Sequence, residues 1–350
     1  MPPDIAAFLQ NDPALPLVVI VWPGPGRTGW FARSLGPGLR WAFFGTTPCF
    51  ALERTITTPY LPRIRGGFLA ALYAVRHRAR LVVSHDPRVS FACQFFLHKL
   101  GFRGKHLAFS FNFPCLPSGL KHRLMADAFR DIDRFLVYSQ VERTLYHRSF
   151  GIPLNKIDFR HWAVAPPTVE NPHRPLIDAD YICAMGENSR DYPTLMAAIA
   201  TLPHIRLVLV ARPHNLVGLH FPPNVQVLTN IPLARAMNIL KFSRFMVLPL
   251  AGGQVPCGHV TIVSAMHLGK AFVATDSAGI HDYATHEHNA LLCEPHSPTA
   301  MAAAIARLYD DPDLCAQLGA NGARFAAACC CEQSMFDYFR GYLLELGLLR

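Results

Sequence analysis

A glycine-rich loop near the start of the chain has residues that could bind phosphate. Residues 24–29, Gly-Pro-Gly-Arg-Thr-Gly, follow the first apolar run and match the G-x-G-x-x-G pattern of dinucleotide-binding loops. That pattern also needs an acidic residue about 20 positions later to hold the ribose, whereas the second predicted strand ends in the uncharged residues 45–48. Pro25 also removes one backbone amide donor. Three interpretations stay open: an NAD(P) site, a plain Gly/Pro turn, and a loop at an interdomain cleft in which Gly26 and Arg27 contact a ligand's phosphate or sugar.

Two further loops with phosphate-binding chemistry lie in the second half. Arg190 stands in the loop that begins at Gly186, between a predicted strand and a helix, and a guanidinium can bind phosphate through two hydrogen bonds. The alternative for Arg190 is a surface salt bridge with Asp191. The loop 249–258 leads into another predicted helix, whose first amides carry partial positive charge. The candidate phosphate or donor contacts in this half are Gly186, Arg190, Arg212, Gly258, His259, Val260 and Thr261.

The elements that must position these loops alternate between strand and helix. Continuous apolar runs such as 17–22 and 205–211 are typical of strands buried on both faces of a parallel sheet. Helix-length segments such as 88–100 and 233–242 separate them. This alternation predicts an α/β protein with doubly wound sheets. A proline-rich segment at 162–175 interrupts the pattern, so we expect a linker there, and a cleft between two similar domains as the ligand site.

Composition excludes several classes of protein. The chain has 350 residues, of which 51% are hydrophobic and 16% charged, so it is globular and large enough for two domains. Its apolar runs are far shorter than the roughly 20 residues of a membrane-spanning helix, and its first residues do not resemble a secretory signal. The 10 cysteines include no C-x-x-C pair, and we interpret 329–331 as small buried residues rather than a metal or redox site. These features predict a cytoplasmic protein.

The basic residues indicate which partners to expect. There are 33 Lys and Arg against 24 Asp and Glu, a formal charge of +9, with clusters at 63–80 and 121–134. Apolar residues such as Phe68, Leu72, Leu124 and Phe129 are interleaved with them, which is compatible with amphipathic helices on an anionic membrane surface at the inner face. The alternative is an ordinary solvated basic face. No nucleic-acid-binding motif accompanies the charge, so nucleic acid is not an expected partner.

The second half resembles the donor half of GT-B glycosyltransferases of the family 4 type. The resemblance rests on the pattern Gly186-x3-Arg190-Asp191-Tyr192, on 258–275 with its Gly-His-x-Thr-Ile start, on 279–283, and on 289–292. It implies two Rossmann-like domains that face a cleft: an acceptor domain at 1–165, a nucleotide-sugar donor domain at 176–330, and a last helix at 331–350 that packs back on the first domain. It also implies that Arg190 contacts the donor phosphates.

The sequence departs from that family at two positions. The carboxylate that usually holds ribose or sugar hydroxyls is Ser264 here, and its partner eight residues earlier is Pro256. Ser264 therefore joins the donor-binding candidates, and the donor's identity stays open. The resemblance implies transfer of a sugar from a nucleoside diphosphate to the hydroxyl of an acceptor glycan or glycolipid. No Asp-x-Asp pair stands in a suitable loop context and the cationic groups can neutralise the phosphates, so we expect no metal or other cofactor. The alternatives are a nucleotide-sugar epimerase of the same architecture and a non-catalytic binding module.

The first half offers candidates for the chemical step. His85 and Asp86 follow a predicted strand at the edge where loops meet a ligand. If the transfer inverts configuration, one of them is suited to be the general base, because histidine titrates near neutral pH. If it retains configuration, they position sugar hydroxyls. The alternative is an Asp-Pro turn that caps the next helix. Asn112, which ends the strand 106–111, is a candidate on the acceptor side.

Overall fold

The computed structural model describes residues 14–22, 38–46 and 60–349. Gly26 and Arg27 lie outside the described residues. The chain divides into two compact units, one ending at Arg160 and completed by the residues from Met335 onward, the other spanning His161–Ser334. Within the described part, no helix is both long and apolar enough to cross a membrane.

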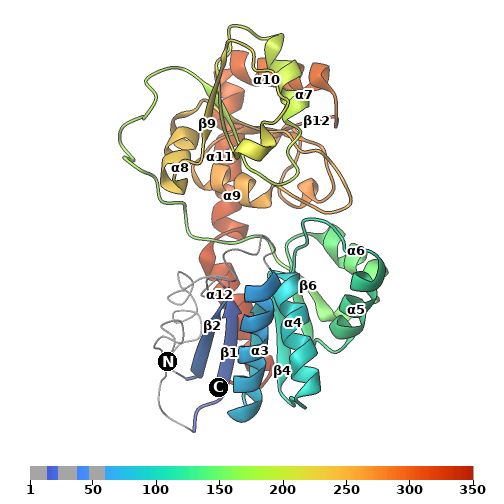
Figure 1. Cartoon of the computed structure of the whole chain (residues 1–350). Helices are drawn as coiled ribbons and strands as arrows, with labels where there is room; N and C mark the ends of the chain where they lie inside the picture. Colours follow the sequence, from blue (N-terminus) through green and yellow to red (C-terminus); the bar gives the residue numbers. More distant parts are fainter. Residues whose placement is uncertain (1–13, 23–37, 47–59, 350) are drawn as a thin grey trace. The chain divides into compact units, whose positions relative to one another are not determined.

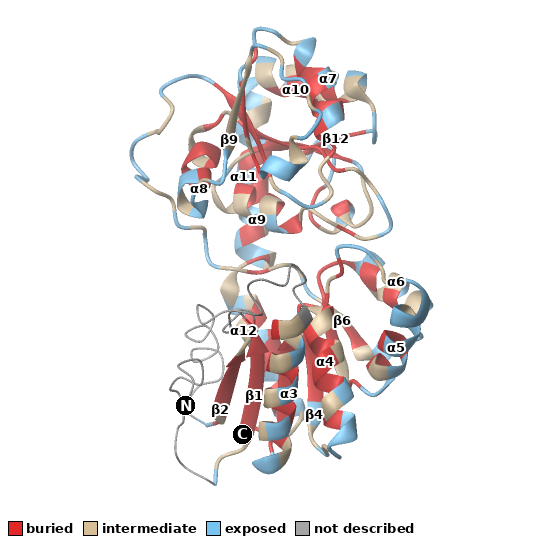
Figure 2. Ribbon diagram, in the orientation of Figure 1, coloured by how far each residue is buried: buried red, intermediate tan, exposed pale blue. Residues whose placement is uncertain are grey.

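The first unit is built on a six-stranded parallel sheet with the order β2-β1-β3-β4-β5-β6 (Figure 1). Its strands are β1 Leu17–Trp22, β2 Arg40–Gly45, β3 Leu81–His85, β4 Lys105–Phe109, β5 Arg134–Val137 and β6 Ile157–Phe159. All six residues of β1 are buried, as expected for a strand covered on both faces (Figure 2). The last of these strands is too short and too polar to stand out in the sequence.

Helices surround this sheet. They are α3 Tyr60–Arg76, α4 Pro87–Lys99, α5 Gly119–Arg130, α6 Gln140–Phe150 and α12 Glu332–Glu345, with a 3₁₀ turn at Leu154–Lys156. Helices α3 and α4 pack on each other and share one core with β1 and β3. Helix α12 returns to this unit from the end of the chain: Phe339 lies edge-on to Phe109 at 6.1 Å between ring centroids. The hydroxyl of Tyr338 donates to Asp158 at 3.0 Å.

The second unit has its own six-stranded parallel sheet, with the order β12-β11-β10-β7-β8-β9. Its strands are β7 Ile182–Met185, β8 Leu207–Ala211, β9 Val225–Thr229, β10 Met246–Leu248, β11 Phe272–Thr275 and β12 Leu291–Cys293. Its helices are α7 Tyr192–Ala200, α8 Leu233–Phe242, α9 His259–His267, α10 Pro298–Asp310 and α11 Pro312–Cys329, with 3₁₀ turns at Pro213–Asn215 and Ile280–Asp282. The strand order reverses between β7 and β10, and ligands of open α/β sheets bind at the carboxyl ends of the strands at such a reversal.

The proline-rich segment 162–175 has many exposed residues, but contacts at its two ends attach it to the second unit. The backbone amide of Trp162 donates to the hydroxyl of Tyr283 at 2.7 Å. The side-chain amide of the fully buried Asn238 donates to the carbonyls of Glu170, Asn171 and Arg174. The unit boundaries therefore fall after Arg160 and after Ser334, whereas the sequence placed the domain ends at 165 and 330.

The predicted basic clusters differ in their exposure. Phe68, Leu72 and Leu124 are exposed, as amphipathic helices require. Phe129 is fully buried, so its place in an exposed apolar face was wrong. Arg134 lies in β5 and pairs with Asp158 at 3.1 Å and with Glu345 at 2.5 Å. The pattern failed at these two because they lie where the chain turns from α5 into the buried sheet.

Candidate nucleotide-sugar site

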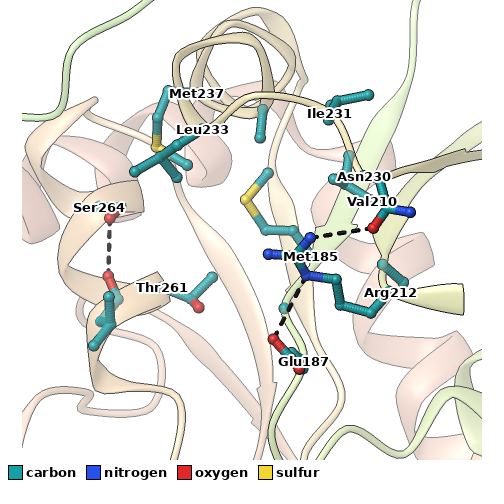
Figure 3. A pocket seen from close by; sticks show the side chains of 14 residues that line it. Met185, Glu187, Val210, Arg212, Asn230, Ile231, Leu233, Met237, Thr261 and Ser264 are labelled. Atoms are coloured by element: carbon teal, nitrogen blue, oxygen red, sulfur yellow. Dashed lines mark hydrogen bonds and ion pairs between the residues drawn. The ribbon is translucent and has the colours of Figure 1, made fainter. Parts of the chain in front are cut away.

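A cavity of about 280 Å³ opens at the carboxyl ends of β7 and β8 in the second unit (Figure 3). Its walls come from four segments that are distant in sequence: the end of β7, the end of β8, the loop after β9 with the start of helix α8, and the first turns of helix α9. The lining residues are Met185, Gly186, Glu187, Val210, Ala211, Arg212, Asn230, Ile231, Leu233, Ala236, Met237, Val260, Thr261 and Ser264. Most of them are apolar, and the few polar groups stand at two sides.

Arg190 lies beside this cavity and is held by neutral acceptors. Its guanidinium donates to the carbonyl of Met185 at 3.1 Å, to that of Asn188 at 2.6 Å and to the hydroxyl of Thr261 at 3.0 Å. It forms no ion pair with any carboxylate among the described residues, and burial lowers its pKa. Partial removal of a positive charge from water costs free energy when no opposite charge is near, so this arrangement favours an anion next to Arg190.

Asp191 is not the ion-pair partner of Arg190. Its carboxylate accepts from the backbone amide of Thr194 at 3.1 Å and from the Thr194 hydroxyl at 2.7 Å, and so caps α7. It also pairs with Nδ1 of His296 at 2.9 Å. The alternative of a surface salt bridge between Arg190 and Asp191 is therefore wrong.

Gly186 allows the guanidinium to lie where it does. Its φ of 125° is a backbone conformation that side-chain-bearing residues rarely adopt. A Cβ atom at this position would come within 2.2 Å of the Arg190 guanidinium. The glycine thus provides both the turn at the end of β7 and the space for the cation.

Helix α9 begins beside Arg190. Its N-cap is Gly258 in the left-handed conformation, with φ of 94°, and the helix then presents Val260, Thr261 and Ser264 to the cavity. Because the first amides of a helix have no intrahelical partners, the start of α9 adds partial positive charge near Arg190. The Ser264 hydroxyl donates to the carbonyl of Val260 at 2.9 Å, within its own helix.

His259 does not line the cavity. Its ring is buried and stacks on Tyr283 with 5.9 Å between centroids. Burial, together with the charge of Arg190, lowers its pKa to about 4, so the ring is neutral at pH 7. The first residue of α9 therefore points into the packing of its own unit rather than into solvent.

Arg212 and Glu187 stand across the cavity from α9. Arg212 Nε lies 3.6 Å from the Glu187 carboxylate, and its guanidinium donates to Asn230 at 3.1 Å (Figure 3). Glu187 is the one carboxylate among the lining residues. Sequence reasoning missed Glu187 and Asn230. The only signal for either was that Glu187 follows Gly186.

In the first unit, Asp86 is fully engaged at the end of β3. Its carboxylate accepts from the backbone amide of Arg88 at 2.7 Å, which caps α4, and pairs with the Arg88 guanidinium at 2.5 Å and with Arg63 at 3.8 Å. Burial alone raises its pKa, but the bonds and charge of Arg88 and the charge of Arg63 hold it below the usual value. Asp86 therefore has the capping role that the sequence left as an alternative. The His85 ring lies 4.1 Å from that of Trp22, between centroids.

Asn112 is tied to a buried carboxylate that sequence reasoning did not single out as a site residue. Its side-chain amide donates to Glu142 at 2.6 Å, and the Tyr146 hydroxyl donates to the same oxygen at 2.8 Å. Glu142 is fully buried, and this burial raises its pKa to about 7 although these bonds lower it. Asn112 thus holds the loop after β4 in place.

Comparisons with known proteins cover both units. Residues 181–311 match the family described as Glycosyl transferases group 1, a range that contains the whole cavity lining. No curated protein matches the chain. Among solved structures, a sucrose-phosphate synthase from Thermosynechococcus elongatus has a TM-score of 0.71 at 15% identity, over 95% of this chain and 99% of that one.

Two other solved structures are similar. HepE of Anabaena in complex with UDP has a TM-score of 0.68 at 13% identity, over 95% of this chain and all (100%) of that one. A glycosyltransferase from Rickettsia africae has a TM-score of 0.67 at 14% identity, over 95% of this chain and 99% of that one. At these identities the likeness shows the fold. The predicted fold, two Rossmann-like domains of the GT-B type, is confirmed, as is the resemblance of the second half.

Proposed function

We propose that this chain, whose residues 181–311 match the group 1 glycosyl transferases and whose fold is of the GT-B type, transfers a sugar from a nucleoside diphosphate sugar to an acceptor hydroxyl. The observation that carries the proposal is the partly buried guanidinium of Arg190, which has no carboxylate partner among the described residues and stands beside a cavity at the strand-order reversal. A nucleoside diphosphate supplies both the missing negative charge and an apolar ring for the cavity.

The cavity separates the two parts of such a donor. The apolar wall of Met185, Val210, Ile231 and Met237 fits a nucleobase, since cofactor and ligand rings bind in mostly apolar pockets with a few placed polar groups. The diphosphate then lies toward Gly186, where Arg190 and the first amides of α9 meet. Uridine is the first base to test, because HepE binds UDP in the same fold.

The same groups would assist the chemical step. When the bond between the sugar and the diphosphate breaks, negative charge grows on the leaving phosphate. Arg190 and the start of α9 are placed to stabilise that charge, and we propose that they do so without a metal ion. We propose that the transferred group is a hexosyl or related sugar.

The acceptor hydroxyl needs positioning and, for an inverting reaction, a base. His85 is the better candidate of the predicted pair, because two arginines hold the Asp86 carboxylate ionised and occupied. An imidazole ordinarily titrates near neutral pH and can take the proton of the acceptor.

Nucleotide binding tests the donor site directly. Thermal shifts are measured with UDP, GDP and ADP; at a hundredfold excess over Kd, a bound nucleotide adds about 2.7 kcal/mol to the unfolding free energy. We expect one of them to stabilise the protein, and no shift with any would overturn the proposal.

A turnover assay then separates the candidate activities. Release of nucleoside diphosphate only when an acceptor is present is expected for a transferase. An epimerase would instead change the sugar without an acceptor, and a binding module would leave the donor intact.

We further propose that the protein works at the inner face of a membrane on a glycolipid or polysaccharide precursor. The support is helix α5, where Leu120 and Leu124 are 72% and 50% exposed one turn apart, beside the basic Lys121 and Arg123. Such a pairing of apolar and basic groups binds anionic interfaces. Co-sedimentation with anionic vesicles should fall in Leu120→Ser/Leu124→Ser. Unchanged binding would show that α5 is not part of the membrane-binding surface.

A further inference from the structure

A second hollow, of about 510 Å³, lies in the first unit at the amino-terminal ends of its strands, far along the chain from the donor cavity. It is formed where the end of α3 meets the segments that lead into β3 and β4. Its lining residues are Ala74, Val75, Arg78, Ala79, Arg80, Gly101, Phe102, Arg103 and Gly104. No step of the proposed reaction uses this hollow, although Arg78 and Arg80 belong to the basic cluster at 63–80.

Three arginines surround the hollow without opposite charges. Arg78, Arg80 and Arg103 form no ion pair with any carboxylate of the described residues. Asp131 and Asp133 are engaged elsewhere: Asp131 pairs with His98 at 3.0 Å, and Asp133 pairs with Lys105 at 2.8 Å. Like charges gathered around one concavity repel each other and raise the local concentration of anions.

The surrounding sequence concentrates this charge. Residues 60–105 contain nine Lys and Arg but a single acidic residue, Asp86, whereas the whole chain has an excess of only nine. Asp86 follows the carboxyl end of β3 and already pairs with Arg63 and Arg88. Most of the chain's positive excess therefore lies in residues 60–105, which include every lining residue of the hollow.

Backbone contacts fix the segments that carry Arg78 and Arg80 and bring Gly104, next to Arg103, close to them. The amide of Arg80 donates to the carbonyl of Leu17 at 2.9 Å, and the amide of Lys105 donates to the carbonyl of Arg80 at 2.9 Å. A Cβ atom at Gly104 would lie 2.7 Å from the carbonyl oxygen of Ala79, so a glycine is needed for this approach. Arg78 has φ of 50°, a conformation that costs free energy in a residue with a side chain. The cluster is thus built on fixed strand ends rather than on mobile loops.

We propose that this hollow binds the phosphate group of a phosphate ester, with Arg78, Arg80 and Arg103 as its ligands. Guanidinium groups bind phosphate oxygens through paired charge-assisted hydrogen bonds. The volume lies within the range of pockets for small organic ligands, so it has room for more than the phosphate itself. The ester is either a soluble phosphorylated compound or the headgroup of an anionic lipid, and the experiment distinguishes these two sources.

The test uses the full chain in an Arg190→Ala background, so that the donor site does not contribute phosphate binding. Isothermal titration measures glycerol 3-phosphate, and co-sedimentation measures vesicles of phosphatidylglycerol against vesicles of phosphatidylcholine. The variant Arg78→Gln/Arg80→Gln/Arg103→Gln removes the cluster. The control Arg148→Gln/Arg174→Gln/Arg206→Gln removes the same formal charge from exposed positions elsewhere.

We expect the cluster variant to bind at least tenfold more weakly than the control. Loss of glycerol 3-phosphate binding identifies a soluble ester, and loss confined to phosphatidylglycerol vesicles identifies the lipid headgroup. Equal binding by the cluster variant and the control overturns the proposal, as does a parent protein that binds neither probe. UDP binding, measured with Arg190 present, should be the same in both variants, so the donor proposal is judged separately.

Discussion

At the carboxyl ends of the two sheets, one charged side chain has oppositely charged partners and the other has only neutral ones. In the first unit, the Asp86 carboxylate has a backbone amide and two guanidinium groups as partners. In the second unit, the Arg190 guanidinium has two carbonyls and a hydroxyl, and no described carboxylate. A charge that is already paired stabilises its own turn, whereas a partly buried charge with only neutral partners is available for a ligand. This difference supports our proposal that the anionic donor binds in the second unit.

Removing the unpaired cation should have the largest effect. Arg190→Ala is expected to weaken binding of the matching nucleoside diphosphate more than a hundredfold, because two charge-assisted bonds of about 1.5–3 kcal/mol each are lost. Isothermal titration measures the affinity, and circular dichroism checks that the variant is folded. Arg206→Ala, an exposed arginine of the same unit, is the control and should bind normally. Equal affinities in the two variants would contradict the comparison.

Lowering the pH should reduce the free energy of unfolding, because burial and the charge of Arg190 oppose protonation of His259. The folded-state pKa of His259 is about 4, below its unfolded value of 6.5, so between these pH values the unfolded chain binds more protons. Its contribution to stability is therefore complete above pH 6.5 and is lost as pH falls toward 4, by roughly 3 kcal/mol.

Denaturant unfolding of the wild type and of His259→Phe at several pH values isolates this contribution. The variant keeps a ring for stacking on Tyr283, and its stability should fall less between pH 6.5 and 4. The subtraction is needed because Glu142, with a raised pKa of about 7, loses its contribution in the opposite direction, as pH rises from 4.5. Parallel curves for the two proteins would rule out a neutral buried His259.

Removing the paired charge should affect stability but not binding. Asp86→Ala is expected to lower the free energy of unfolding by about 1–2 kcal/mol, as for other lost helix caps. Nucleotide affinity should not change, because the donor site is in the other unit. Asp127→Ala, which removes an exposed pair with Arg130, should cost less. A drop in nucleotide affinity in Asp86→Ala would show that the two sheet edges are not independent.

The smallest expected effect concerns the sugar of the nucleotide. Ser264 lines the cavity but bonds within its own helix, so that wall offers the ribose no carboxylate. Ser264→Glu should tighten binding of the nucleotide a few-fold, by about 1 kcal/mol for one hydrogen bond. The gain should disappear with the 2′,3′-dideoxy nucleotide, while Ser264→Gln serves as the uncharged control. A gain that persists with the dideoxy compound would point to a contact other than ribose.

Sequence reasoning predicted the elements that bear local signals. The fully apolar β1 and the helix at Leu233–Phe242 could be read from their patterns, as could Gly186 and Arg190 from a loop between strand and helix. These signals are local because each depends on the spacing of neighbours in one segment. The short β6 has no such signal, because three residues, one of them an aspartate, are too few to show a pattern.

The parts of the site that depend on tertiary contacts could not be predicted. One of the two arginine partners of Asp86 lies in α3, on the other side of β3 in the sequence. Glu142 accepts a hydrogen bond from Asn112 in the loop after β4. Whether His259 faces the ligand or the core depends on Tyr283, which lies in a separate turn. A lone sequence shows which residue types are available, but not which of them already have partners.

Helix α12 has a consequence for the order in which the two units complete their folding during synthesis. Domains generally fold from the amino terminus as the chain emerges, yet the first unit here lacks Phe339, Tyr338 and Glu345 until the ribosome has finished the second. During synthesis, Phe109 lacks Phe339 and Arg134 lacks Glu345 while His161–Ser334 can form its own core. The first unit therefore completes its fold after the second, and a nonsense mutation in the codons for α12 would remove part of the core of the first unit.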